Sequence, residues 1–104
     1  MTPNLKPLFI PLKREYFEAF KSGVKTEELR RYGPRWNTET CTIGRPVTLS
    51  LGYGKAHRIT GKIWRFKRQH GSTFDRTYKA AILAVFGTLD IDIACISIVL
   101  DHKE

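Results

Sequence analysis

Short stretches of the chain alternate between apolar and polar residues with a period of two, which predicts β-strands. The clearest lies at 46–51, where Val47, Leu49 and Leu51 alternate with two hydroxyl side chains. Further strands are predicted at 8–12 and 57–68. The stretch 91–100 is almost continuously apolar, so we expect it to be a central strand that closes a barrel.

Two other stretches place their apolar residues at helical spacing. In the first, 13–22, one side carries Tyr16, Phe17 and Phe20, followed by Val24. Gly23 then occupies the place of a left-handed helix cap. We expect the aromatic rings of this helix to pack in the core rather than to stack on a ligand.

The second helix follows a capping signal, Ser72-x-x-Asp75, and should end at Gly87. Its spacing predicts a buried stripe of five residues: Phe74, Tyr78, Ala81, Ile82 and Val85. A chain of 104 residues is long enough for one hydrophobic core but not for two. We therefore expect a single α+β domain over 1–104, a small mixed β-barrel of five to six strands with two flanking helices, after a loose lead-in at 1–7.

The long strand at 57–68 contains a conflict. Ile59 and Ile63 have one parity, whereas Trp64 and Phe66 have the other, so a regular strand cannot bury both pairs. A bulge near Gly61 would turn Ile59, Trp64 and Phe66 inward, and we favour this arrangement. It leaves five cations outside: Arg58, Lys62, Arg65, Lys67 and Arg68. Without the bulge, Trp64 and Phe66 would form a stacking surface on the basic face.

Positive charge is concentrated in one part of the chain. The net charge is +8, and the stretch from Lys55 to Lys79 holds eight Lys or Arg residues against the single acid Asp75. A patch of this kind points to a polyanion or an anionic membrane surface as partner. No apolar run approaches the ~20 residues that span a bilayer. We expect nucleic acid, and no membrane, as the partner of a monomer.

Cysteine and histidine give no metal-binding pattern. Cys41 and Cys95 lie far apart, and neither belongs to a Cys-x-x-Cys pair. No secretory leader precedes them, so we expect free thiols in a reducing cytoplasm. The three histidines add no zinc-ligand spacing, and we expect neither a structural metal nor a cofactor.

The stretch 23–30 holds the densest candidate chemistry, with Lys25, Thr26, Glu28 and Arg30 within six residues. It follows the first helix and reads as the start of a strand. Alternation should put Thr26, Glu28 and Arg30 on one face and Leu29 on the other. A solvated face with loose ion pairs is the alternative explanation.

Two further segments combine aromatic residues with cations. The loop 31–37 interleaves two arginines, Arg31 and Arg35, with Tyr32 and Trp36. Such a loop suits single-stranded nucleic acid, because bases stack on rings while arginines hold phosphates. The alternative is that Trp36 folds back as a lid on the barrel. Tyr53, between two glycines, should be exposed in a turn, either to stack on a base or merely to fill the turn.

The pattern Gly-x-Lys-Thr-x-Glu-x-Arg after an amphipathic helix, with Ile43-Gly44-Arg45-Pro46-Val47 opening a strand downstream, resembles the ASCH domain family over residues 8 to 68. The resemblance implies a PUA-like barrel and a link to RNA or modified-nucleoside chemistry. Some relatives are amidohydrolases with a Lys–Thr–Glu set, in which the threonine stands three residues after the lysine. Here Glu28 occupies that position. Other relatives are ribonucleases or RNA- or DNA-binding modules, whose Lys, Glu and Arg correspond to Lys25, Glu28 and Arg30.

Three functions therefore remain open. The first is binding of RNA or single-stranded DNA, with phosphate held by Lys25 and Arg30, and further contacts from Arg35, Trp36, Tyr53, Arg58, Lys62, Arg65 and Arg68. Glu28 would accept from a base amino group or orient Arg30. The second is hydrolysis of RNA or of a modified nucleoside, with Lys25 and Glu28 as catalytic residues and Thr26 as the weaker candidate. The third is a protein-interaction domain whose basic face meets an acidic partner.

Overall fold

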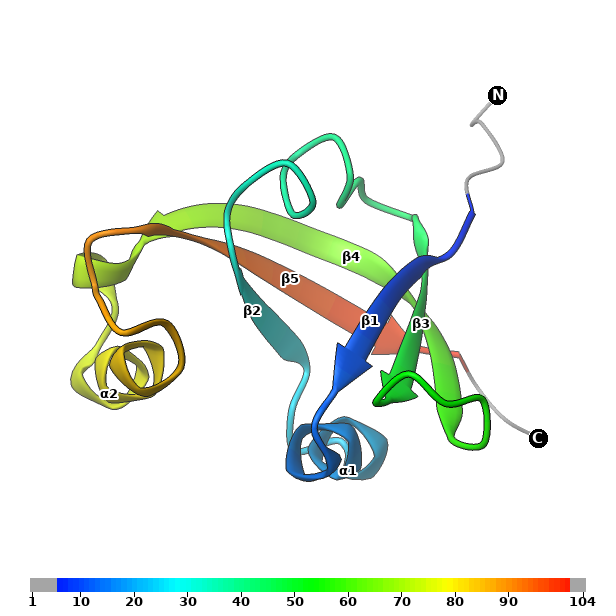
Figure 1. Ribbon diagram of the computed structural model, residues 1–104. Coiled ribbons are helices and arrows are strands. Elements are labelled where there is room, and N and C mark those ends of the chain that lie inside the picture. The colour runs from blue at the N-terminus through cyan, green and yellow to red at the C-terminus, as the bar shows by residue number, and fades with distance from the viewer. Residues whose placement is uncertain (1–5, 102–104) are drawn as a thin grey trace.

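The computed structural model describes residues 6–101, which form five strands, two α-helices and one short 3-10 helix (Figure 1). In chain order the elements are β1 (Leu8–Leu12), α1 (Arg14–Ser22), β2 (Glu27–Arg31), β3 (Pro46–Leu51), β4 (Arg58–His70), η1 (Gly71–Thr73), α2 (Arg76–Phe86) and β5 (Asp92–Leu100). The predicted α+β class, a small mixed barrel-like sheet with two helices, is confirmed.

The strands form one sheet in the order β1-β3-β4-β5-β2. Only β1 and β3 run parallel, and all other neighbours are antiparallel. The sheet curls into a half-barrel whose two edge strands, β1 and β2, lie on the same side with α1 joining them (Figure 1). The gap between these edges, which we call the seam, is the part of the barrel without backbone pairing.

Two apolar clusters stabilise the sheet from opposite faces. The inner cluster fills the half-barrel and includes Phe17 and Phe20 of α1. The outer cluster lies between the sheet and α2 and is centred on Ile82, Ile93 and Cys95. β5 is buried on both faces because Ala94 and Ile96 belong to the inner cluster while Ile93 and Cys95 belong to the outer one. The expectation of a central strand is confirmed, since β5 pairs with β4 and β2.

Helix α1 begins after Lys13 and ends at Gly23, whose φ of 86° is the left-handed cap that the sequence predicted. Phe17 and Phe20 are buried, as expected. Tyr16 and Val24 are not buried, contrary to the prediction: Tyr16 is 37% exposed and Val24 is 85% exposed. The helix has ended by Val24, so the helical spacing no longer applies to it.

Helix α2 differs from its predicted packing. Asp75, not Ser72, caps it by accepting a hydrogen bond from the backbone N–H of Tyr78, and Ser72 belongs to η1. Of the stripe on the helix itself only Ile82 is buried, whereas Tyr78, Ala81 and Val85 are exposed. Helical spacing identifies an apolar face, but it does not show whether another element covers that face.

Strand β4 has its bulge at a different residue from the one predicted. The register with β5 shifts between Ile63 and Arg65, so Trp64 is the extra residue, and its side chain is 54% exposed. The expectation that Trp64 is buried is therefore wrong. Gly61 has another role: a Cβ there would collide with the backbone oxygen of Val99. The predicted exposure of Arg58, Lys62, Arg65, Lys67 and Arg68 is confirmed.

Cys41 and Cys95 are free thiols buried in the core, as the sequence predicted. Burial raises the pKa of the Cys41 thiol, and burial, with a smaller contribution from Glu27, raises the pKa of Cys95 to about 11. Both sulfurs therefore stay protonated and unreactive near neutral pH. Within residues 6–101, no helix is long and apolar enough to cross a membrane.

Candidate functional site

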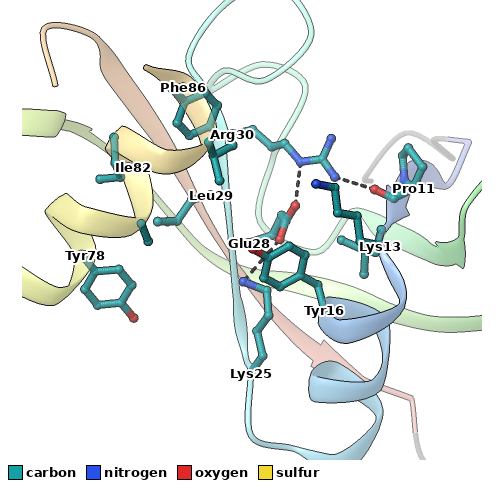
Figure 2. A pocket seen from close by; sticks show the side chains of 13 residues that line it. Pro11, Lys13, Tyr16, Lys25, Glu28, Leu29, Arg30, Tyr78, Ile82 and Phe86 are labelled. Atoms are coloured by element: carbon teal, nitrogen blue, oxygen red, sulfur yellow. Dashed lines mark hydrogen bonds and ion pairs between the residues drawn. The ribbon is translucent and has the colours of Figure 1, made fainter. Parts of the chain in front are cut away.

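A groove of about 400 Å³ lies at the seam, between α2 on one side and the start of α1 on the other (Figure 2). One wall is formed by Leu29 of β2 and by five residues of α2: Tyr78, Ala81, Ile82, Val85 and Phe86. The opposite wall is formed by Pro11, Leu12, Lys13 and Tyr16. Three polar side chains lie between the walls: Lys25, Glu28 and Arg30.

Arg30 links the two edges of the half-barrel. Its Nε donates to Glu28 Oε2 over 2.7 Å, and its Nη2 donates to the backbone carbonyl of Pro11 in β1 over 2.7 Å (Figure 2). Glu28 and Arg30 are two residues apart on β2, so strand alternation puts both on the same face. The side chain of Glu28 is 10% exposed and that of Arg30 is 22% exposed. The guanidinium is thus fixed in orientation but still accessible from the groove.

Lys25 approaches the same carboxylate from the turn before β2. Its backbone N–H donates to the carbonyl of Ala19, and its Nζ lies 3.4 Å from Glu28 Oε1. The ammonium also lies 5.5 Å and 5.3 Å from the ring centroids of Tyr16 and Phe20. The sequence prediction that Lys25, Glu28 and Arg30 come together is confirmed. The alternative of a solvated Glu28 is wrong, because the carboxylate is enclosed by both cations.

Thr26 does not share the groove with these residues, contrary to the expected common face of Thr26, Glu28 and Arg30. β2 begins at Glu27, so strand alternation does not extend back to Thr26, whose side chain is exposed. Its carbonyl accepts a hydrogen bond from the backbone of Ile98. The Thr26 side chain lines a second hollow, described below, instead of the groove.

Trp36 packs in the inner cluster and is only 8% exposed. Of the two alternatives left open by the sequence, the lid is confirmed, and the ring is not available to stack on a base. Its indole lies against two guanidinium groups, with the Cζ of Arg30 at 4.9 Å and that of Arg35 at 5.4 Å from the ring centroid. Trp36 therefore supports Arg30 from the core side, while Arg35 remains exposed.

Three cations of β4 form what we call the basic face: Lys62, Arg65 and Lys67. They lie on the outer side of the sheet, because each pairs with a β5 residue, Val99, Ser97 or Cys95, that points away from the inner cluster. Within the described part of the chain, these three side chains form no ion pair. They are available to an external anion.

Arg58 and Arg68 are partly engaged inside the protein. Arg58 donates to the carbonyl of Gly54 and lies 5.1 Å from the ring centroid of Phe9. Arg68 pairs with Asp92 at 2.7 Å and lies over the ring of Tyr32, and the hydrogen bond that Arg68 donates to Asp92 raises the pKa of Arg68 further. Arg68 pairs in register with Ala94 of the inner cluster, so it does not belong to the basic face.

Tyr53 is 78% exposed, as predicted, in the turn between β3 and β4. Its ring lies 6.0 Å from that of Phe9 and lines neither the groove nor the second hollow. Arg58 and Arg68 also line neither of them, so these three predicted contact residues lie outside both hollows.

A second hollow adjoins the groove, and Lys25 is the residue that lines both. Its walls include Thr26, Trp64 and Val99. Sequence reasoning did not assign Trp64, Lys13, Tyr16 or Tyr78 to the site. For Trp64 the sequence did contain an indication, because Trp64 lies two residues after Lys62 in β4 and alternation puts both on one face. For Tyr16 and Tyr78 the helical spacing indicated burial, and no sequence pattern separates a groove wall from a core.

His70 lies between a serine and an aspartate, an order that resembles a hydrolase triad. Its Nδ1 is 2.7 Å from Ser72 Oγ, and its Nε2 is 3.3 Å from Asp90 Oδ1. The backbone N–H of Ser72 also donates to His70 Nδ1, which makes the imidazole the cap of η1. The Asp90 side chain is 96% exposed and neither hollow includes these residues, so we interpret the cluster as a helix cap.

No family model matches the sequence, and none of the curated proteins matches it. The resemblance to the ASCH domain family therefore remains an expectation that rests on the motif at 23–30. Among residues 6–101, no group of three or more His, Cys, Asp or Glu side chains could hold a metal ion. The chemistry available at the groove is that of three cations, Lys13, Lys25 and Arg30, with one carboxylate and largely apolar walls.

Proposed function

We propose that this protein binds single-stranded RNA or DNA, with one nucleotide in the seam groove. The observation that carries the proposal is the enclosure of Lys25, Glu28 and Arg30 between apolar walls. Binding sites for small organic groups are typically apolar clefts of about 300–1,000 Å³ with a few oriented polar groups. A groove of about 400 Å³ falls within that range.

Each part of a nucleotide has a matching group in the groove. Arg30 uses Nε for Glu28 and Nη2 for Pro11, which leaves the N–H groups of Nη1 to donate to a phosphate oxygen. Lys25 and Lys13 add positive charge at the same opening. A carboxylate accepts up to about four hydrogen bonds, so Glu28 can accept from a base amino group while it holds its two cations. The rings of Tyr16 and Tyr78 offer apolar surface to a base.

The basic face of β4 extends the proposed contact beyond one nucleotide. Lys62, Arg65 and Lys67 are exposed and carry no internal ion pair within the described residues. Contacts from such side chains to phosphates add affinity without sequence preference. We place this activity in the cytoplasm, where buried thiols stay reduced.

Binding is favoured over hydrolysis because the groove lacks an activated nucleophile. The Thr26 side chain does not line it, and both oxygens of Glu28 already face a cation. General base catalysis requires a group that is free to take a proton from water or a hydroxyl. Should turnover of RNA or of an acylated nucleoside be found, Lys25→Ala should abolish it and Thr26→Val should retain most of it.

The proposal is tested by fluorescence anisotropy with labelled single-stranded RNA and DNA of mixed sequence. Lys25→Ala should weaken binding on the order of 10-fold, because it removes a charge-assisted contact. Lys21→Ala is the matched control: it removes the same charge from an exposed position on α1 that lines neither hollow. Equal losses in the two variants, or no binding by the wild type, would contradict a role for the groove.

The same assay repeated over a series of salt concentrations tests the contribution of the basic face. If about five phosphates are contacted, log affinity should fall against log salt with a slope of roughly −3.5 for single strands. The triple variant Lys62→Ala, Arg65→Ala, Lys67→Ala should weaken all sequences alike and reduce the slope. An affinity that does not change with salt concentration would count against nucleic acid as the partner and in favour of an uncharged or protein partner.

A further inference from the structure

Trp64 is the most unusual exposed residue of the sheet. Large aromatic side chains are mostly buried in a domain of this kind, yet 54% of this residue is exposed while its neighbour Ile63 is 1% exposed. The bulge explains the exposure, because the register shift between Ile63 and Arg65 turns two consecutive side chains, Trp64 and Arg65, away from the core.

The bulge also places the indole among cations. Lys62 lies two residues before Trp64 on the same face, and Arg65 follows it directly. On the neighbouring strand Val99, which pairs with Lys62, is 52% exposed and extends the apolar surface. Ser97, which pairs with Arg65, donates a hydrogen bond to the carboxylate of Glu27 on β2. The result is a flat aromatic ring with cations on its own strand.

This surface continues into the groove. Trp64 and Val99 line the second hollow, and the seam groove shares one residue with that hollow, Lys25. A phosphate held at Lys25 would therefore lie between a base in the groove and a base at Trp64. A chain of nucleotides has this order of base, phosphate and base, whereas a free nucleoside does not.

We propose that Trp64 is a base-stacking platform for a second nucleotide, so that the ligand is a single-stranded oligonucleotide spanning both hollows rather than a free nucleoside. The inference rests on the proposed function and adds to it the class of ligand and a second binding position. The charge of the neighbouring residues favours a nucleic acid over an uncharged protein segment, because Lys62 and Arg65 have no internal ion pairs within the described residues.

The test compares an eight-nucleotide RNA of mixed sequence with the four ribonucleoside 5′-monophosphates, the latter measured by calorimetry. Trp64→Ala should lower the affinity for the eight-nucleotide RNA by roughly 5- to 150-fold, the usual effect of losing one base–aromatic stack. The affinity for the monophosphates should not change. Trp64→Phe should restore most of the affinity. Leu83→Ala is the control, since Leu83 is 47% exposed on α2 and lines neither hollow.

Tryptophan fluorescence provides a second readout. Trp36 is buried and Trp64 is exposed, so stacking of a base should quench the emission of Trp64. The quenching should be absent in Trp64→Phe, which keeps only the emission of Trp36.

Unchanged RNA affinity in Trp64→Ala, with Lys25→Ala still impaired, would overturn the platform and leave the groove intact. If the wild-type protein binds neither the RNA nor the monophosphates, both the proposed function and the Trp64 platform are wrong. Binding to anionic lipid vesicles without binding to RNA would assign the indole and its cations to a membrane surface and overturn the platform.

Discussion

Glu28 determines the chemistry of the seam because each of its carboxylate oxygens faces a different cation. Oε1 lies 3.4 Å from Lys25 Nζ, and Oε2 accepts from Arg30 Nε at 2.7 Å. Without the carboxylate, two like charges would face each other in a partly enclosed groove, where their repulsion is screened less than in water. Glu28 therefore has a structural role in addition to any contact with a ligand.

A double-mutant cycle on Glu28→Gln and Arg30→Met should reveal this coupling. Removing Arg30 leaves Glu28 Oε2 and the carbonyl of Pro11 without the donor that they share, in a site where Glu28 is 7% exposed, while Lys25 remains at Oε1. We expect an interaction free energy of about 1–3 kcal/mol, above the ~0–1 kcal/mol of exposed pairs and below that of fully buried ones. The free energy of unfolding in urea measures it. A value near zero would mean that the contact between the two side chains does not stabilise the fold.

The elements on either side of the seam were predictable to different degrees. Sequence patterns located all five strands and both helices: alternation indicated β3, an almost continuous apolar run indicated β5, and helical spacing indicated α1 and α2. The bulge was placed at Gly61 because glycine in a strand marks either a bulge or a close approach of two backbones, and the sequence does not separate these causes. Here the close approach to Val99 applies, and the bulge falls three residues later, at Trp64.

At the scale of β4, Gly61→Ala should destabilise the fold. An added Cβ would collide with the backbone oxygen of Val99, and overpacking of this kind costs typically about 1–3 kcal/mol. Gly54→Ala is the matched control, because a Cβ there meets no atom within 4 Å. Thermal unfolding followed by circular dichroism compares the two. If Gly61→Ala is as stable as Gly54→Ala, the predicted approach of β4 to β5 is wrong.

The arrangement of the whole molecule explains why the site was only partly readable from sequence. The polar cluster was found because its members, Lys25, Glu28 and Arg30, lie within six residues of one another along the chain. The walls were missed because they come from α2 and from the start of α1, elements separated by about half of the chain and brought together by the curl of the sheet (Figure 1). Trp36 was left undecided between lid and stacking residue because burial of a loop aromatic depends on the core that it covers.

The central claim is that nucleic acid binds along one path from the seam groove past Lys25 to Trp64. Titration of 15N-labelled protein with the eight-nucleotide RNA, followed by two-dimensional NMR, tests it most directly. The account predicts that the largest shifts occur at the backbone amides of Lys25, Glu28 and Arg30 and at the side-chain indole N–H of Trp64, while the indole N–H of Trp36 changes little. Shifts confined to the turn around Tyr53 and to the exposed side of α2 around Leu83, with Lys25 and Trp64 unaffected, would contradict it.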